Sequence, residues 1–295
     1  MQRKDYIDAP GALALIVFSS LMGLNQVLVK LVNAGMHPVF QAGARSLCAF
    51  IPVLLWAWLR KKPLNIRDGS LGPGMLAGLF FSGEFVLLFT ALEYTSVSRA
   101  SVFFYTMPLW TALGAHWLIP GERLTVLRVT GLFVAITGVV LALSRNNAPV
   151  SDLAFVGDIM CLLGAMLWAG IALLARTTAL SKSCPEMALL YQLGVSAPIL
   201  LAAAPLLGEP IREMTPLIGG IFAFQVIVVV AFGFALWFWA LSIYPAGSMT
   251  SFSFLAPVFG VFFGWALLNE VISPFIVIAL ILVSLGVVLV NRKPG

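Results

Sequence analysis

Glu84 is a carboxylate within an otherwise apolar stretch whose length suits a helix that crosses a membrane. An unpaired carboxylate inside a bilayer costs several kcal/mol, so this side chain is expected to face the interior of a helix bundle, either paired or protonated. One interpretation is a structural pair with Lys30 or Arg45, which are expected at a similar depth. The other is a site that couples transport to protons or binds the amine of a substrate.

Other polar and aromatic side chains also lie within apolar stretches. Asn25, Gln225 and Ser253 either join helices through hydrogen bonds or bind the amino and carboxyl groups of a substrate. Trp168 and Tyr105 lie deep in such stretches beside small neighbours and are suited to stacking on a flat substrate, although packing in the core or against lipid is the alternative. These five side chains are candidates for substrate binding, together with the buried carboxylate.

The composition identifies lipid as the solvent. Of the 295 residues, 61% are hydrophobic and 10% are charged, whereas soluble globular domains carry about 25% charged residues. The formal charge of +5 indicates contact with anionic lipid headgroups rather than with nucleic acid. The three cysteines are far apart and form neither a disulfide framework nor a CxxC metal-binding spacing. No metal and no cofactor are expected.

Apolar runs that could cross the hydrocarbon core occur about ten times. A helix needs roughly 20 apolar residues for this crossing, and short loops with Pro, Gly or Asn separate the runs. The expected spans are 11–32, 38–59, 71–92, 97–118, 124–143, 154–176, 186–206, 217–240, 246–268 and 273–291. The fold class is therefore expected to be all-α integral membrane, with ten transmembrane helices.

The basic residues set the expected orientation. With an even number of spans both termini lie on one side, and twelve of the 17 Lys and Arg residues then fall on that side. Because basic residues accumulate in cytoplasmic loops, both termini are expected in the cytoplasm. The chain is thus predicted to be a multi-pass protein of a bacterial-type inner (plasma) membrane.

The second half of the chain repeats the first. Motifs recur at offsets of 148 or 149 residues, namely 105–110 with 254–259, 121–124 with 269–272, and 138–141 with 286–289. These offsets divide the chain into one five-helix repeat at 1–147 and a second at 148–295. A repeat with an odd number of spans is inverted relative to its copy, and inverted repeats are typical of secondary transporters, which open a central site to each side in turn.

Two pairs of residues occupy equivalent positions in the two halves. Pro108 and Pro257 interrupt equivalent spans, and because proline removes a backbone donor, both helices are expected to break there. Lys30 and Arg176 end equivalent spans on opposite faces, where they either extend toward the headgroups or form ion pairs at gates. Arg45 is a third candidate for such an ion pair.

The ordered set of short motifs resembles the EamA-type branch of the drug/metabolite transporter superfamily. The motifs are Met22-Gly23-Leu24-Asn25, Ala91-Leu92-Glu93-Tyr94, Met107-Pro108-Leu109 and Gly121-Glu122-Arg123-Leu124 in the first half, and Leu167-Trp168-Ala169, Ala240-Leu241, Ala256-Pro257-Val258 and Asn269-Glu270 in the second. The resemblance implies ten helices in two inverted five-helix repeats and the export of small metabolites. It is strongest to the aromatic amino-acid exporters of the YddG type. One difference is that Met22 stands where the first-span motif usually has Trp, which occurs only in the second copy, as Trp168.

We therefore expect a secondary transporter that exports aromatic and other neutral amino acids, or similar small metabolites, by alternating access. The alternative is a broad-specificity drug or organic-cation exporter that uses Glu84. The sequence contains no HExxH or GxGD motif and no GxxxxGK loop, so neither an intramembrane enzyme nor a primary pump is expected. The expected partners are the small-molecule substrate and the bilayer, and the protein is expected to act as a monomer.

Overall fold

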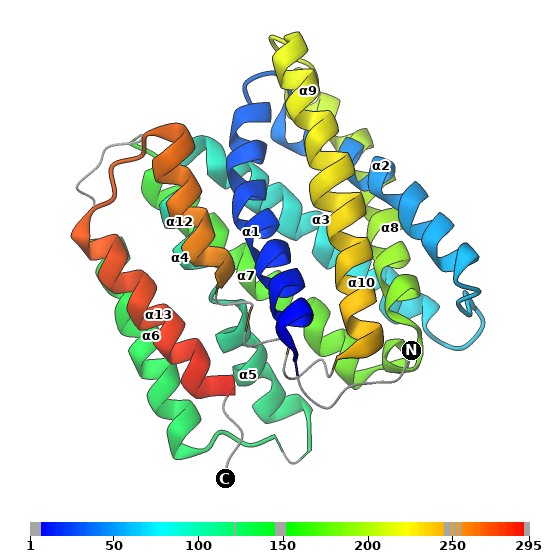
Figure 1. Ribbon diagram of the computed structural model, residues 1–295, viewed down its shortest axis with the longest axis horizontal. Coiled ribbons are helices and arrows are strands. Elements are labelled where there is room, and N and C mark those ends of the chain that lie inside the picture. Colours follow the sequence, from blue (N-terminus) through cyan, green and yellow to red (C-terminus); the bar gives the residue numbers. More distant parts are fainter. Residues whose placement is uncertain are drawn as a thin grey trace.

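The computed structural model describes residues 7–120, 122–144, 152–244, 249, 252 and 255–291. Within these residues every regular element is a helix, and one isolated backbone bridge joins Met36 to Ile211. In chain order (Figure 1) the elements are α1 (Ala9–Val32), α2 (Pro38–Leu59), α3 (Leu71–Tyr94), α4 (Val97–Phe104), α5 (Met107–Leu118), α6 (Val126–Ser144), α7 (Ala154–Thr177), η1 (Ala179–Lys182), α8 (Pro185–Leu207), α9 (Pro216–Phe224), η2 (Gln225–Phe232), α10 (Gly233–Ile243), α12 (Leu255–Leu268) and α13 (Pro274–Asn291).

Seven of the helical runs in this part of the chain are long and apolar enough to cross a membrane. They are α1, α2, α3, α6, α7, α8 and the continuous run Pro216–Ile243, which joins α9, η2 and α10, while α12 and α13 are shorter apolar helices. Large apolar side chains lie on the outside, with Trp58 and Trp117 each 71% exposed, as expected for a surface in contact with lipid. The protein is therefore an all-helical, multi-pass membrane protein, as the sequence predicts, whereas the number of ten spans stays a prediction.

Proline and aspartate determine where several helices begin. Pro38, Pro185 and Pro216 are the first residues of α2, α8 and α9. The first N–H groups of a helix have no partner within it, so proline costs no hydrogen bond at this position. At the start of α1, the Oδ1 atom of Asp8 accepts a hydrogen bond from the N–H of Gly11 at 3.1 Å. These residues explain why the expected starts of the first, second, seventh and eighth spans are close to the observed ones.

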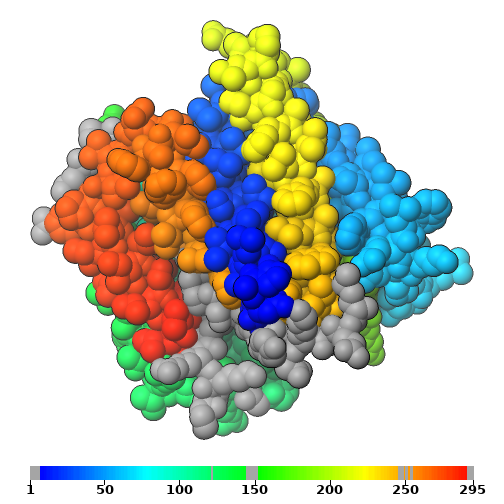
Figure 2. Space-filling view, viewed as in Figure 1, coloured from blue at the N-terminus to red at the C-terminus, as the bar shows by residue number. Residues whose placement is uncertain are grey.

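Small residues allow the helices to pack closely. Because lipid tails are as apolar as the side chains, helix association in a membrane depends on close packing rather than on hydrophobic burial. Between α1 and α12, a Cβ added to Gly23 would lie 2.6 Å from the backbone nitrogen of Gly260. Between α6 and α13, a Cβ added to Gly131 would lie 2.7 Å from the carbonyl oxygen of Gly286. Figure 2 shows α1 between α12 and the run Pro216–Ile243, and Figure 1 shows α13 along α6.

Of the two spans that contain the equivalent prolines, the first is not one continuous helix. The span expected at 97–118 is divided into α4 and α5, and the break lies at residues 105–106. Pro108 is the second residue of α5, so it lacks the N–H that would bond to the carbonyl oxygen of Phe104 in an unbroken helix. Pro257 lies in the first turn of α12. Residues 253 and 254, which precede that helix, are outside the described part of the chain.

Candidate functional site

A group of polar side chains lies within the long helices, and we call it the central polar cluster. Its members are Asn25 of α1, Gln41 and Arg45 of α2, Glu84 of α3 and Gln225 of η2. The Oδ1 atom of Asn25 accepts hydrogen bonds from Arg45 Nη1 and Gln225 Nε2, each at 3.1 Å. Gln41 Nε2 donates to Gln225 Oε1 at 3.4 Å. Polar contacts therefore join three separate helices inside the bundle.

The central polar cluster lies at membrane depth. Asn25, Arg45 and Glu84 are seven to ten residues from one end of their helices, which is about 10–15 Å along the helix axis. Gln225 is the first residue of η2, a π-helical segment inside an otherwise α-helical run. Such segments are rare and frequently mark functional sites. The position of the cluster and the irregular helix beside it both favour a role in binding.

Glu84 is the acid of this cluster. It is 4% exposed, and its Oε2 atom has no hydrogen-bond partner among the residues that the structure describes. Arg45 acts on it electrostatically. The ion pairs formed in the described part of the chain do not include one between these two side chains, and Lys30, the other expected partner, contacts Glu270 instead. Glu84 is therefore a buried carboxylate whose charge is not matched by a contacting base.

Arg45 is the base of the cluster, and the face of α3 positions it. Its Cζ atom lies 4.8 Å from the centre of the Phe85 ring and 5.3 Å from that of Phe89, so the guanidinium is held by cation–π contacts. A guanidinium has five N–H groups, and the hydrogen bond to Asn25 uses one of them. The side chain is half-buried. Arg45 thus has N–H donors inside the bundle that form no hydrogen bond with α1, α2 or α3 beyond the one to Asn25.

The two aromatic candidates come together beside this cluster. Trp168 of α7 stacks on Phe104 with ring centres 5.1 Å apart, and the edge of Tyr105 meets Trp168 at 6.1 Å. Both Trp168 and Tyr105 are half-buried. Gly164, one turn before Trp168, lets the helices approach: a Cβ added there would lie 3.5 Å from the Phe104 ring and 3.7 Å from the carbonyl oxygen of Glu84. The aromatic group and the backbone of Glu84 therefore lie against the same point of α7.

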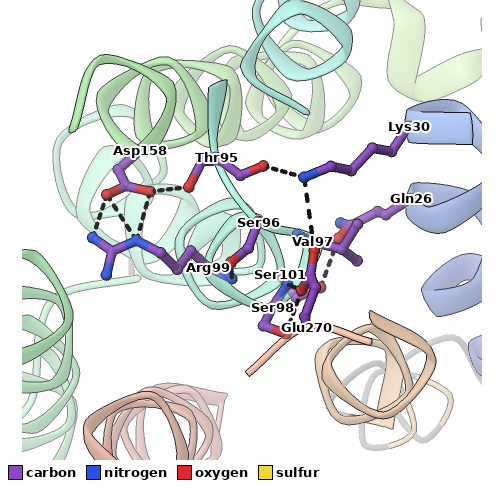
Figure 3. A network of polar contacts seen from close by, with 10 residues as sticks. All are labelled: Gln26, Lys30, Thr95, Ser96, Val97, Ser98, Arg99, Ser101, Asp158 and Glu270. Atoms are coloured by element: carbon purple, nitrogen blue, oxygen red, sulfur yellow. Dashed lines mark hydrogen bonds and ion pairs between the residues drawn. The ribbon is translucent and has the colours of Figure 1, made fainter. Parts of the chain in front are cut away.

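A second polar network joins α1, α4 and the loop before α13 at what we call the Lys30 end of the bundle (Figure 3). Glu270 accepts hydrogen bonds from the backbone N–H of Val97 at 2.7 Å and of Ser98 at 2.9 Å, and from the Ser98 hydroxyl at 2.7 Å. Lys30 Nζ donates to the carbonyl oxygen of Thr95 at 2.6 Å and lies 3.7 Å from Glu270 Oε1. Because the free N–H groups of a helix start attract anions, the carboxylate is held at the start of α4.

The same network continues to α7. The hydroxyl of Thr95 donates to Asp158 Oδ1 at 2.7 Å, and Asp158 forms an ion pair with Arg99 of α4 in which both side chains are buried. Ser101 also donates to Gln26 Oε1 at 2.6 Å, which ties α4 to α1. The start of α4 is therefore bonded to α1, to α7 and to the loop between α12 and α13, as Figure 3 shows.

A separate ion pair lies at the opposite end of α7, which we call the Arg176 end. Arg176 pairs with Glu122, and their side chains are 43% and 33% exposed, compared with 23% and 11% for Lys30 and Glu270. Eighteen residues of α7 separate Arg176 from Asp158, which corresponds to about 27 Å along the helix. The two ion pairs are thus at opposite ends of the bundle, with Gly164 and its aromatic neighbours between them.

Several predicted residues come together and others remain apart. Asn25, Arg45, Glu84 and Gln225 share the central polar cluster, whereas Lys30 and Arg176 take part in the two distant ion pairs. The prediction for Ser253 concerns a residue outside the described part of the chain. Gln41 was not predicted, although its position four residues before Arg45 places both on one face of α2, which was a usable signal.

No group of three or more His, Cys, Asp or Glu side chains that could hold a metal ion occurs among the described residues. The central polar cluster itself consists of three side-chain amides, one guanidinium group and one carboxylate group. Such a set can donate and accept hydrogen bonds and can match both a positive and a negative charge. The arrangement is therefore suited to binding a small polar or charged molecule.

Similar proteins are transporters of comparable length. The Escherichia coli (strain K12) protein named "Probable amino-acid metabolite efflux pump" is 27% identical over 303 residues, which is 97% of this chain and 94% of that protein. The Bacillus subtilis (strain 168) protein named "Uncharacterized transporter YoaV" is 23% identical over 277 residues, covering 93% and 94%. A solved crystal structure superposes with a TM-score of 0.63 and 18% identity over 96% of this chain and 97% of the other, which supports the fold.

A family match covers nearly the whole chain and occurs twice along it. The model of the EamA-like transporter family matches residues 9–144 and again residues 155–292. This result confirms the resemblance that the short motifs indicate, and it identifies the protein as a membrane transporter. The chain belongs to the EamA-like transporter family.

Proposed function

We propose that this membrane transporter exports aromatic and other neutral amino acids, or similar small metabolites, by alternating access. The observation that carries the proposal is the central polar cluster, a buried set of side chains that contains both a base and an acid. Neutral amino acids carry both charges, so such a set suits them. The printed name of the Escherichia coli relative, an amino-acid metabolite efflux pump, supports the same class of substrate.

Two observations support alternating access. The family match falls once on each half of the chain, as expected if ten spans form two inverted five-helix repeats at 1–147 and 148–295. The ion pairs at the two ends also use equivalent positions, because Lys30 corresponds to Arg176 and Glu270 corresponds to Glu122 in the two halves. Opening of one end while the other is closed would expose the central polar cluster to each side in turn.

The candidate residues then take distinct roles. Trp168 and Tyr105 contact the side chain of the substrate, since both are half-buried and lie beside the cluster. Asn25 and Gln225 contact the charged ends of the substrate, and Ser253 is a further candidate for this contact. The break before Pro108, and the one expected at Pro257, would give the helices that line the path freedom to bend.

The remaining expectations fit this mechanism. We place both termini in the cytoplasm of a bacterial-type cell because of the distribution of basic residues. A path enclosed by one chain needs no second copy, so the transporter is proposed to act as a monomer. The energy for export comes from a gradient of the substrate or of another solute, because the sequence holds no nucleotide-binding loop.

Purified protein in liposomes tests the proposal. Liposomes loaded with labelled phenylalanine should release it at least tenfold faster when they contain the protein than when they do not. Release at the rate of protein-free liposomes would reject the substrate assignment. An imposed proton gradient in the same assay shows whether protons drive the export.

The second candidate function is the export of organic cations, and the buried carboxylate of Glu84, which contacts no base within the described ranges, favours it. This reading predicts that the wild-type protein releases a planar organic cation without a carboxylate faster than protein-free liposomes do. It also predicts that Arg45→Gln accelerates that release, because the nearby positive charge is removed. A cation release rate equal to passive leakage rejects this alternative.

A further inference from the structure

We propose that Arg45 and Glu84 are the two ends of a clamp for a zwitterion: the guanidinium binds the carboxylate of the substrate, and the carboxylate of Glu84, with Gln41, binds its ammonium group. This inference rests on the proposed function and specifies how the substrate is recognised. The site then selects for molecules that carry an ammonium group and a carboxylate group on the same carbon atom. It would reject amines and carboxylic acids that share the same side chain.

The first argument is the unbalanced pair of charges. Inside a membrane protein, opposite charges are expected to pair, because an isolated charge is costly there. Arg45 and Glu84 act on one another electrostatically and lie on neighbouring helices, α2 and α3, yet form no contact ion pair. Instead, Arg45 is held by Asn25 and by the rings of Phe85 and Phe89. These contacts hold the guanidinium in place without using Glu84 as its partner.

The second argument is the inventory of hydrogen-bonding groups. Two buried acceptor atoms of the cluster, Glu84 Oε2 and Gln41 Oε1, lack a donor among the described residues. Arg45 has four N–H groups beyond the one bonded to Asn25, and its side chain is half-buried rather than sealed. A buried polar group without a partner is costly. An ammonium group supplies the missing donors, and a carboxylate supplies acceptors for the guanidinium.

The third argument is the place of the aromatic group. The carbonyl oxygen of Glu84 and the Phe104 ring both lie within 4 Å of the Cβ position that Gly164 leaves empty. Phe104 in turn stacks on Trp168, which is met by the edge of Tyr105. The aromatic group thus packs at the level of the Glu84 backbone, and we propose that a substrate held by the Glu84 carboxylate extends its side chain toward these rings. This geometry favours amino acids with a flat apolar side chain.

The electrostatic consequence is a requirement for both charges at once. An amine satisfies Glu84 but leaves the guanidinium of Arg45 without a counter-charge, and a carboxylic acid leaves Glu84 unmatched. A site built around buried polar groups rejects a ligand that leaves one of them unpaired far more strongly than it rejects a change of apolar size. We therefore expect phenylalanine to bind at least about tenfold more tightly than either analogue.

The decisive experiment uses the wild-type protein and three probes. Equilibrium binding to the purified, detergent-solubilised transporter is measured by titration calorimetry for phenylalanine, phenylalanine methyl ester and 3-phenylpropionate. The methyl ester lacks the carboxylate charge and 3-phenylpropionate lacks the ammonium group. The expected result is a Kd for phenylalanine at least tenfold lower than for both analogues. Binding of either analogue within about threefold of phenylalanine would overturn the clamp.

Two substitutions assign the ends of the clamp. Glu84→Gln should abolish the preference for phenylalanine over 3-phenylpropionate while retaining that over the ester, and Arg45→Gln should do the reverse. A merely structural role would change both preferences together, which would contradict the assignment. Glu209→Gln and Arg123→Gln, which remove exposed charges outside the cluster, should retain both preferences. Where a Gln variant fails to fold, Glu84→Asp or Arg45→Lys replaces it, with the same preference weakened rather than lost.

The outcomes separate this inference from the proposed function. If the wild-type protein releases phenylalanine from liposomes but binds the ester or the acid equally well, the clamp is wrong and the export function stands. If phenylalanine is neither bound nor released, the proposed function itself fails.

Discussion

The carboxylate of Glu270 lies 3.7 Å from the Nζ atom of Lys30 and at the same time accepts hydrogen bonds from the backbone of Val97 and Ser98 at the start of α4. One side chain therefore joins α1, α4 and the loop before α13. At the other end of the bundle, Glu122 contacts Arg176, and both of these side chains are more exposed. The ion pairs at the two ends are thus similar in type, but the pair at the Lys30 end is more buried than the pair at the Arg176 end.

Removing the charge of Glu270 should open the Lys30 end. Glu270→Gln loses the charge that the N–H groups of α4 and the ammonium of Lys30 share, and hydrogen bonds to charged groups contribute about 1.5–3 kcal/mol. We expect at least about tenfold faster labelling of a cysteine placed at Ala100, a fully buried residue of α4 whose side chain takes no part in the polar contacts of this network. The measurement is the rate of reaction with a water-soluble maleimide, in a background without the three native cysteines. An equal rate in Glu270→Gln and in the control Glu209→Gln would show that Glu270 does not hold this end closed.

Weakening the other ion pair should have the opposite effect. Arg176→Gln favours opening at the Arg176 end, and in alternating access this closes the Lys30 end more firmly. Because Arg176 and Glu122 are partly exposed, their pair contributes only about 0–1 kcal/mol, so labelling at residue 100 should slow by no more than about fivefold. The charge-reversed double variant Arg176→Glu with Glu122→Arg should restore the original rate. Faster labelling in Arg176→Gln would contradict coupling between the ends.

The buried ion pair between Asp158 and Arg99 should be essential for stability. Asp158→Asn leaves the guanidinium of Arg99 buried without a counter-charge, and breaking a buried pair in this way costs about 3–5 kcal/mol. We expect a clear fall in the thermal unfolding temperature of the purified protein, measured by intrinsic fluorescence. Asp152→Asn, at an exposed position near the start of α7, is the matched control and should unfold like the wild type. A variant at Asp158 that unfolds like this control would show that the pair adds little.

Trp168 should determine the preference for aromatic substrates. Trp168→Ala removes the ring that stacks on Phe104, and an aromatic pair contributes about 0.5–1.5 kcal/mol beyond the buried area. The KM for phenylalanine export should therefore rise by roughly three- to tenfold, whereas the KM for alanine should change little. Trp168→Phe keeps a ring at this position and should stay near the wild type. A parallel rise in both KM values would indicate a general structural defect instead of a substrate contact.

The helix boundaries were largely predictable because they depend on local chemistry. Pro38 and Pro185 begin α2 and α8 close to where the sequence places the second and seventh spans. The division of one span into α4 and α5 was expected at Pro108, but the break lies at residues 105–106, because proline disturbs the turn before itself. The π-helical segment that begins at Gln225 had no signal, since the apolar pattern of that span is the same for both kinds of helix.

The sequence predicts which residues belong to the site better than it predicts which of them contact one another. Polar residues within apolar spans identified Asn25, Glu84 and Gln225, since their presence at membrane depth is costly. Which of them meet depends on how distant helices pack, so the hydrogen bond between Asn25 and Arg45 had no local signal. For the same reason the sequence offers Lys30 as a partner of Glu84, whereas Lys30 contacts Glu270 in the structure.

Counterflow tests the central claim, alternating access for an amino acid, most directly. Proteoliposomes are loaded with a high concentration of unlabelled phenylalanine and diluted into buffer with a trace of labelled phenylalanine. A carrier that exposes one site to each side in turn predicts a transient accumulation of label above its equilibrium level. The reason is that each unlabelled molecule that leaves brings the site to the outer face, where it binds labelled substrate for inward transport. A monotonic approach to equilibrium, without an overshoot, would contradict alternating access and indicate a channel.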